Sequence, residues 1–248
     1  MTLDADRIIL PMGRGRKSVF LPRSEWLTKP AACKMIWNRI GYELHVTVEV
    51  ESAQPSKKKV NATVDLGQIH QCAVTTDTGE GLIVSDRGLR SEKRRLNQMH
   101  GSLAGKMPRS KKGSKRWHKL NRARNSYTLR AERRIRDMRH KGTRQGIDFC
   151  QGNEVSDLYI GDPDGVRNKP CDRKHNQRMS QWEYGKDIEY LGSKSTQAGI
   201  LSFSGSERGT SSRCRKCSHK HNPRGRNWVS KACGFTGHRD LVRHDQHA

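Results

Sequence analysis

Residues 60–67 have the sequence Val-Asn-Ala-Thr-Val-Asp-Leu-Gly, in which apolar and polar side chains alternate strictly. This period of two is typical of a half-buried β-strand that presents its polar positions, Asp65 among them, on one face. Gly67 follows the strand and permits a tight bend or a close approach of a ligand to the backbone. The same alternation in residues 42–50 predicts a preceding strand, and Asp77-Thr78-Gly79 predicts the turn of a following hairpin.

Helical patterns follow these strands. We expect helices over residues 91–104 and 115–137, separated by Gly105, Pro108 and Gly113. A short strand over residues 157–160 and a helix over residues 179–199 come next, the latter with Trp182, Ile188 and Leu191 on its apolar side. Strands that alternate in this way with helices predict an α/β fold.

Positive charge is concentrated in one segment of the chain. The 248 residues carry a net charge of +24, with 49 Lys and Arg against 25 Asp and Glu. Residues 87–144 contain 21 of these basic residues and only 3 acidic ones. A solvated helical face is the alternative explanation, but the one-sided charge around a narrow apolar stripe favours nucleic-acid binding. The candidate contacts are Lys111, Lys112, Lys115, Arg116, Lys119, Arg122 and Arg124.

The overall composition restricts the class of protein. Only 32% of the residues are hydrophobic, which argues against a single compact core. The sequence predicts no membrane-spanning segment and no export signal, so we expect a cytoplasmic, nucleoid-associated protein. Seven cysteines in such a chain favour free thiols or a metal site over disulfides.

Three aspartates are candidates for a shared metal site. Asp65 ends the first strand of the core, Asp162 follows the predicted strand 157–160, and Asp240 lies near the C-terminal end. Carboxylates that converge from such positions suit Mg²⁺, which assists phosphodiester hydrolysis. Each position also has a simpler explanation, a solvent-facing residue or a plain turn.

Cysteines mark a second candidate metal site. Cys214 and Cys217 form a C-x-x-C pair, and Cys233 follows sixteen residues later, which is the outline of a zinc ribbon. Ser230 occupies the position expected for the fourth cysteine. A histidine, at position 219, 221 or 238, is an alternative fourth ligand, and unrelated free thiols are the alternative to a zinc site.

Together these motifs resemble the TnpB family of transposon-encoded RNA-guided endonucleases, which is related to type V CRISPR effectors and to Fanzor proteins. The resemblance extends over residues 42–241 and rests on VDLG, the basic SKKGSKR segment, LYIGDPDGVR, GTSSRCRKC and CGFTGHRD. It implies an RNase H-like (RuvC) nuclease fold with a zinc-ribbon-like insertion, Mg²⁺ and structural Zn²⁺ as cofactors, and DNA and guide RNA as partners.

The resemblance also assigns the catalytic carboxylates. It implies that Asp65 is the first metal-binding carboxylate along the chain and Asp240 the last. At the position of the usual middle glutamate this chain has Gly161, so Glu207 is the expected replacement and Asp162 the alternative.

The same resemblance divides the chain. It implies a partial N-terminal wedge-like β region over residues 1–59 and a RuvC-like core over residues 60–206 that includes the basic helices of 87–144. The zinc-ribbon-like insertion takes residues 207–236, and the last RuvC motif takes residues 237–248. The short N-terminal region, Ser230 and the short C-terminal segment suggest a truncated or degenerate copy. The alternative function is therefore that of a nuclease-inactive, nucleic-acid-binding TnpB-like protein.

Overall fold

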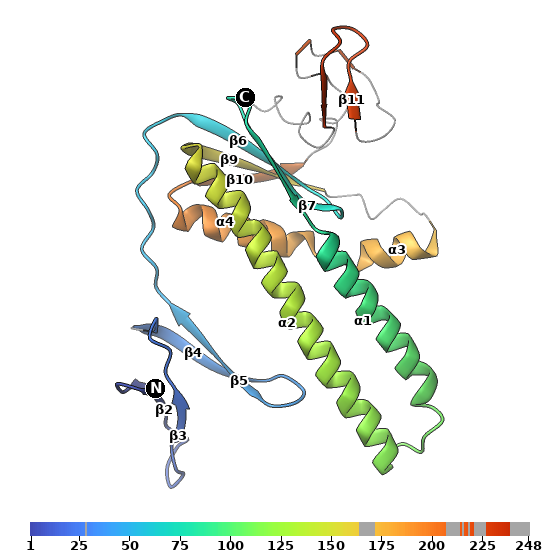
Figure 1. The fold of residues 1–248 in the computed structure, drawn as a ribbon. Coiled ribbons are helices and arrows are strands. Elements are labelled where there is room, and N and C mark those ends of the chain that lie inside the picture. The colour runs from blue at the N-terminus through green and yellow to red at the C-terminus, as the bar shows by residue number, and fades with distance from the viewer. Residues whose placement is uncertain are drawn as a thin grey trace.

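The fold is known from a computed structural model, which describes residues 1–27, 29–163, 172–206, 214, 216–217, 219–220 and 227–238. Twelve strands and four helices lie in this part of the chain. They form an α/β core with two long helices that extend away from it, an N-terminal β unit and a small C-terminal hairpin (Figure 1).

A mixed five-stranded sheet forms the centre of the core. Its strand order is β10-β9-β6-β7-β8, with bounds Val60–Leu66 for β6, His70–Thr76 for β7, Gly81–Ser85 for β8, Val155–Asp162 for β9 and Leu201–Ser206 for β10. β6, β7 and β8 pair in antiparallel fashion, whereas β6 pairs with β9 and β9 with β10 in parallel. The hairpin predicted around Asp77-Thr78-Gly79 is thus confirmed as β7–β8.

Two helices cover one face of this sheet. Helix α2 (Lys115–Gly152) contacts β7, β8 and β9, and helix α4 (Tyr184–Gln197) contacts β9 and β10. Val64 and Leu158 are fully buried beneath them, as is Leu191 of α4. The apolar positions of the predicted strand therefore form the main core, and Asp65 belongs to the opposite face of the sheet.

Helix α2 is longer than predicted. It continues beyond Asp137 to Gly152, although Gly142 and Gly146 lie in the extension. Both glycines face the sheet: a Cβ on Gly142 would lie 1.9 Å from Oε1 of Gln71, and one on Gly146 would lie 3.4 Å from Sγ of Cys72. The small residues permit close packing of helix on strand and do not end the helix.

The structure also differs from the single helix predicted over residues 179–199, because two helices with a short junction between them occupy this region. Helix α3 (Arg173–Ser180) ends before the junction and α4 begins after it. Side chains of other helices donate hydrogen bonds to backbone carbonyl oxygens of the junction. Lys93 donates to the carbonyl of Gln181, and Arg139 donates to the carbonyl of Glu183 at 2.7 Å. Trp182 is buried in the main core between the two helices.

Helix α1 (Arg87–Lys106) packs along α2 to form a helical hairpin. Ser114 caps the start of α2, where its hydroxyl accepts a hydrogen bond from the amide of Trp117. Ala131 and Ile135, which belong to the narrow apolar stripe of the basic segment, are buried in the packing face of α2.

The N-terminal β unit has its own small core. It contains a sheet of β1 (Thr2–Leu3), β2 (Arg7–Leu10) and β3 (Val19–Pro22), and the hairpin of β4 (Pro30–Trp37) and β5 (Tyr42–Val48). Ile8, Leu10 and Leu27 are buried in this unit, separately from the main core. A third cluster surrounds Cys214 near the hairpin of β11 (Asn227–Val229) and β12 (Thr236–His238). The expectation that the chain lacks a single core is thus confirmed.

Within the described ranges, no helix combines the length and the apolar character that a membrane crossing requires.

Candidate functional site

Asp65 lies at the end of β6 and is 5% exposed. It pairs with Ala73 of β7, and both residues line a cavity of about 360 Å³. Arg90 of α1 lines the same cavity, as do His175 and Arg178 of α3. A carboxylate is thereby placed beside several groups able to bind an anion, an arrangement that suits a phosphate ester bound next to a metal ion.

The sheet beside Asp65 carries two glycines. Val64 pairs with Ile160, so Gly161 is the residue of β9 that lies level with Asp65, and Gly161 pairs in turn with Gly205 of β10. Neither glycine has a side chain, so the residues level with Asp65 on β9 and β10 supply no carboxylate.

Asp162 is one residue beyond Gly161 and pairs with Ser206. Because successive residues of a strand point to opposite faces, Asp162 lies on the face of Ile160 and not on that of Asp65. The structure therefore brings these two candidates to the same end of the sheet but not to the same face.

The C-terminal hairpin comes close to this cavity. The ring of His238, the last residue of β12, lies 5.4 Å from the ring of His70 between centroids, and His70 lines the cavity of Asp65. Asp240 follows His238 by two residues in the sequence. Asp240 itself and Glu207 lie outside the described residues.

Three cysteines come together as the sequence predicted. The Sγ atoms of Cys214, Cys217 and Cys233 all lie within 4.8 Å of one another. Those of Cys214 and Cys233 are 3.6 Å apart, close to the ~3.8 Å between two thiolates on a tetrahedral zinc ion with Zn–S bonds of about 2.3 Å. These donors could hold zinc.

Ser230 lies in the place of a fourth ligand. It is 2% exposed, and its Oγ lies 3.5 Å from Sγ of Cys217. Its backbone amide donates to the carbonyl of Phe235, and the amide of Gly234 donates to the carbonyl of Ser230. Ser230 thus lies next to the three thiols in a turn that is hydrogen-bonded on both sides.

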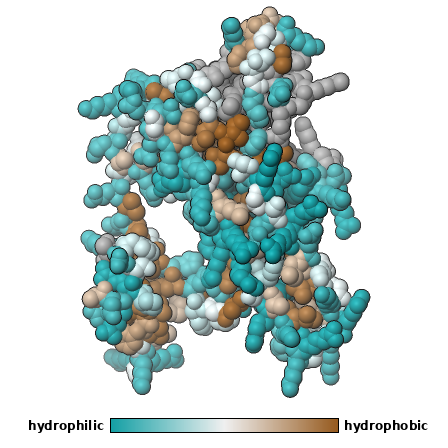
Figure 2. All heavy atoms as spheres, in the orientation of Figure 1, coloured by the Kyte–Doolittle hydropathy of each residue, from teal (hydrophilic) through white to brown (hydrophobic). Residues whose placement is uncertain are grey.

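The basic segment forms the surface of the helical hairpin. All seven candidate nucleic-acid contacts are exposed, in the turn between α1 and α2 and in the first turns of α2. Figure 2 shows hydrophilic residues over much of this hairpin. Of the three acidic residues in the segment, Glu92 is buried and bonded to Arg134, so it weakens the positive surface little.

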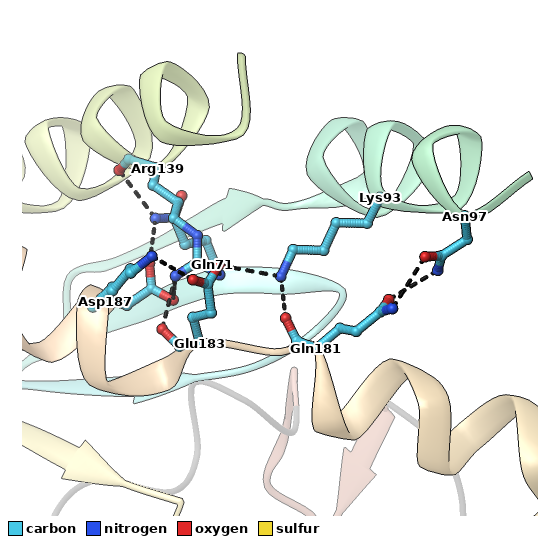
Figure 3. A network of polar contacts seen from close by, with 8 residues as sticks. Gln71, Lys93, Asn97, Arg139, Gln181, Glu183 and Asp187 are labelled. Atoms are coloured by element: carbon cyan, nitrogen blue, oxygen red, sulfur yellow. Dashed lines mark hydrogen bonds and ion pairs between the residues drawn. The ribbon is translucent and has the colours of Figure 1, made fainter. Parts of the chain in front are cut away.

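A buried polar network links the helices to the sheet, and sequence reasoning missed it (Figure 3). Arg139 of α2 is 1% exposed and donates to a carboxylate oxygen of Asp187, itself 2% exposed, at 3.1 Å. Gln71 donates to Asp187 at 3.0 Å and to the carbonyl of Arg139 at 3.1 Å. In the sequence Arg139 is one of the basic residues of the segment 87–144, and the small residues Gly142 and Gly146 that follow it are the signal that this part of α2 is buried.

Asp86 lies near this network at the start of α1 and is 3% exposed. Burial, together with the negative charge of Asp187, raises the pKa of Asp86 to about 7. Burial likewise raises the pKa of Asp187, although Arg139 opposes the shift. The end of α1 next to the candidate site therefore contains a carboxyl group that titrates near neutral pH.

The chain matches known families in two regions. Residues 45–167 match the OrfB_IS605 family, described as a probable transposase, and residues 184–243 match the Cas12f1-like TNB domain. No curated protein matches the sequence.

Two solved structures share the fold. A CRISPR-Cas12f ternary complex is similar with a TM-score of 0.61 and 16% identity, over 82% of this chain and 41% of that one. A Cas12f1–sgRNA–target DNA complex is similar with a TM-score of 0.57 and 18% identity, over 75% of this chain and 37% of that one. The chain thus spans about two fifths of the length of these proteins. It is a TnpB-like protein with the mixed α/β fold of the RuvC-containing Cas12f effectors.

Proposed function

We propose that this protein is an RNA-guided DNA endonuclease that hydrolyses phosphodiester bonds with the help of Mg²⁺. The observation that carries the proposal is the cavity in which Asp65 lies with Arg90, His175 and Arg178. Both similar structures described above are Cas12f complexes, one of them with an sgRNA and a target DNA. The match to a family described as a probable transposase supports a transposon-associated role in this proposal.

The chain's own residues have separate tasks in this proposal. The carboxylates of Asp65, Glu207 and Asp240 hold the metal, and hard carboxylate oxygens are the ligands that Mg²⁺ prefers. Bound there, Mg²⁺ would stabilise the charge on the attacking and leaving oxygens. Arg90 and Arg178 bind the phosphate and orient it toward the carboxylates.

Glu207 is our candidate for the middle carboxylate. It follows Gly205 by two residues in the sequence, whereas Asp162 belongs to the other face of the sheet. Gly161 and Gly205, level with Asp65 on β9 and β10, supply no carboxylate, so the proposal takes the middle carboxylate from another part of the chain. Asp162 remains the alternative.

Guide RNA and DNA would bind along the exposed basic surface of α1 and α2. In RNA-guided recognition, base pairing selects the sequence and the protein binds the backbone of the duplex by shape and charge. Several exposed lysines and arginines on one helical hairpin suit that task, because they make contacts independent of sequence.

A zinc-ribbon-like unit with Cys214, Cys217 and Cys233 as zinc ligands completes the proposal. The division into residues 1–59, 60–206, 207–236 and 237–248 is proposed with it, as is a cytoplasmic, nucleoid-associated location.

The test is a cleavage assay with purified protein, RNA from its own locus, matching DNA and Mg²⁺. Cleavage should be lost in Asp65→Asn and retained in Asp148→Asn, which changes an exposed aspartate of α2. Loss of cleavage in Glu207→Ala but not in Asp162→Ala would support the choice of middle carboxylate, and the reverse result would contradict it.

A nuclease-inactive nucleic-acid-binding protein is the second candidate, favoured by the absence of a carboxylate at Gly161. It predicts binding without cleavage under the same conditions. Either function requires a steep dependence on salt, with a log–log slope of about −5 for six phosphate contacts. A flat salt response would contradict both.

A further inference from the structure

A second cavity, of about 750 Å³, lies between the tip of the β4–β5 hairpin, helices α1 and α2, and the junction of α3 and α4. This volume falls in the range of roughly 300–1,000 Å³ that is usual for sites of small ligands. The network of Figure 3 lies at one side of it, since Lys93, Asn97, Arg139 and Gln181 all line the cavity.

An exposed aromatic pair stands at the hairpin tip. Trp37, which lines the cavity, is 56% exposed, and Tyr42 opposite it on β5 is 71% exposed. Their ring centroids are 5.0 Å apart in an edge-to-face arrangement, so Tyr42 supports the indole ring from outside the cavity. Tyr190 of α4 also lines the cavity and stacks on His140, with centroids 4.1 Å apart. Aromatic surface is thus present on two of the cavity's walls.

The hairpin tip is fixed against α2. Glu43 accepts a hydrogen bond from Arg133, and Arg39 lies 3.8 Å from Glu132. Arg39 has a φ of 77°, a backbone conformation unusual for any residue but glycine, and Asn38 holds the turn by accepting bonds from the amides of Ile40 and Gly41. The position of Trp37 is therefore set by ion pairs to α2.

The basic side chains that line the cavity differ in whether they are already engaged in ion pairs. Lys93 and Arg139 are paired with Glu183 and Asp187. Arg136 of α2 is exposed and, within the described part of the chain, forms no ion pair. Arg136 is therefore the cation of α2 that can bind an anion at the cavity without first breaking a contact.

We propose that this cavity binds an unpaired nucleotide of a nucleic-acid strand, with its base stacked on Trp37 and its phosphate bound by Arg136. An exposed indole and a neighbouring arginine match the two parts of a nucleotide, an aromatic base and an anion. The strand can reach the cavity from the basic surface, because Arg124 and Arg136 lie on the same helix about 18 Å apart along its axis. The proposal rests on the proposed function only in taking nucleic acid as the partner, and it requires no cleavage.

The test compares binding of a labelled twelve-nucleotide single-stranded RNA with binding of a blunt-ended RNA duplex of the same length, both in EDTA so that no metal-dependent cleavage occurs. Trp37→Ala should weaken single-strand binding by between about fivefold and 150-fold, the effect of losing one stacked base. Its effect on duplex binding should be less than twofold. Trp37→Phe should restore most of the affinity, since it retains a stacking ring.

Two further variants make the test specific. Trp26→Ala is the matched control, because Trp26 is 69% exposed in the same N-terminal unit and does not line the cavity. It should leave binding unchanged. Arg136→Ala should reduce the log–log salt slope of single-strand binding by about one, which corresponds to the loss of one phosphate contact.

Equal effects of Trp37→Ala and Trp26→Ala would overturn the proposal, as would equal losses for single strand and duplex. Saturable binding of free AMP at the affinity of the oligonucleotide would overturn it too, because it would assign the cavity to a free nucleotide. A Trp37-dependent preference for single strands, in a protein that cuts no DNA, would leave this inference standing while the proposed nuclease failed.

Discussion

Changing Ser230 to cysteine should complete the cysteine cluster. The side chain is buried, its Oγ lies 3.5 Å from Sγ of Cys217, and the thiols of Cys214 and Cys233 are already 3.6 Å apart. Structural zinc sites contribute about 10–16 kcal/mol, or about 2.5–4 kcal/mol for each of four ligands. Ser230→Cys should therefore tighten zinc binding by between about 70-fold and 900-fold.

The assay is a competition for zinc against a chromophoric chelator, with zinc per chain measured by elemental analysis. Ser102→Cys is the matched control, since it adds one thiol at an exposed position of α1, and it should leave zinc affinity unchanged. Cys217→Ser should weaken binding by a factor similar to the gain in Ser230→Cys, because it removes one thiolate from the same cluster.

An affinity for Ser230→Cys within threefold of that of the unaltered protein would refute this reasoning. It would mean that residue 230 does not face the metal, or that another residue already supplies a fourth strong ligand.

Three further outcomes are expected. Because the pKa of Asp86 is raised to about 7, its contribution to stability is complete below about pH 4 and is lost as the pH rises to about 7, at a cost of up to about 4 kcal/mol. Asp86→Asn should remove this part of the pH dependence of unfolding in urea, and an unchanged profile would contradict the assignment. Arg139→Met should lower the free energy of unfolding by about 3–5 kcal/mol, because it leaves Asp187 buried without its cationic partner, whereas the exposed Arg136→Met should cost less than about 0.5 kcal/mol. A loss for Arg139→Met as small as that for Arg136→Met would show that the ion pair is dispensable. Arg178→Ala should reduce the salt slope of DNA binding by about one, and an unaltered slope would remove Arg178 from the phosphate site.

Strand β6 and the β7–β8 hairpin could be predicted from the sequence because their patterns are local, whereas β10 was not predicted. The period of two in residues 60–66 already places Asp65 on the face opposite Val64, and β6 confirms it. The cysteine cluster was predictable because the C-x-x-C pair of Cys214 and Cys217, with Cys233 sixteen residues later, follows the spacing of a zinc ribbon.

Contacts between distant segments could not be predicted in this way. Arg139 looks like one more cation of a basic helix until Asp187 and Gln71, both far away in the sequence, are brought next to it. The register of β9 on β6, which separates Asp162 from Asp65, is likewise a property of two paired strands. No local pattern contains that information.

The length of α2 has a mechanical consequence. Its 38 residues span about 57 Å, and Gly146 fixes one end against the sheet while Lys115 lies about 46 Å away along the axis. A tilt of about 5° at the sheet would move that distant end by about 4 Å, simply from the length of the rod. Because the helix is long, a small change of packing at Gly146 would produce a much larger displacement at the basic turn between α1 and α2.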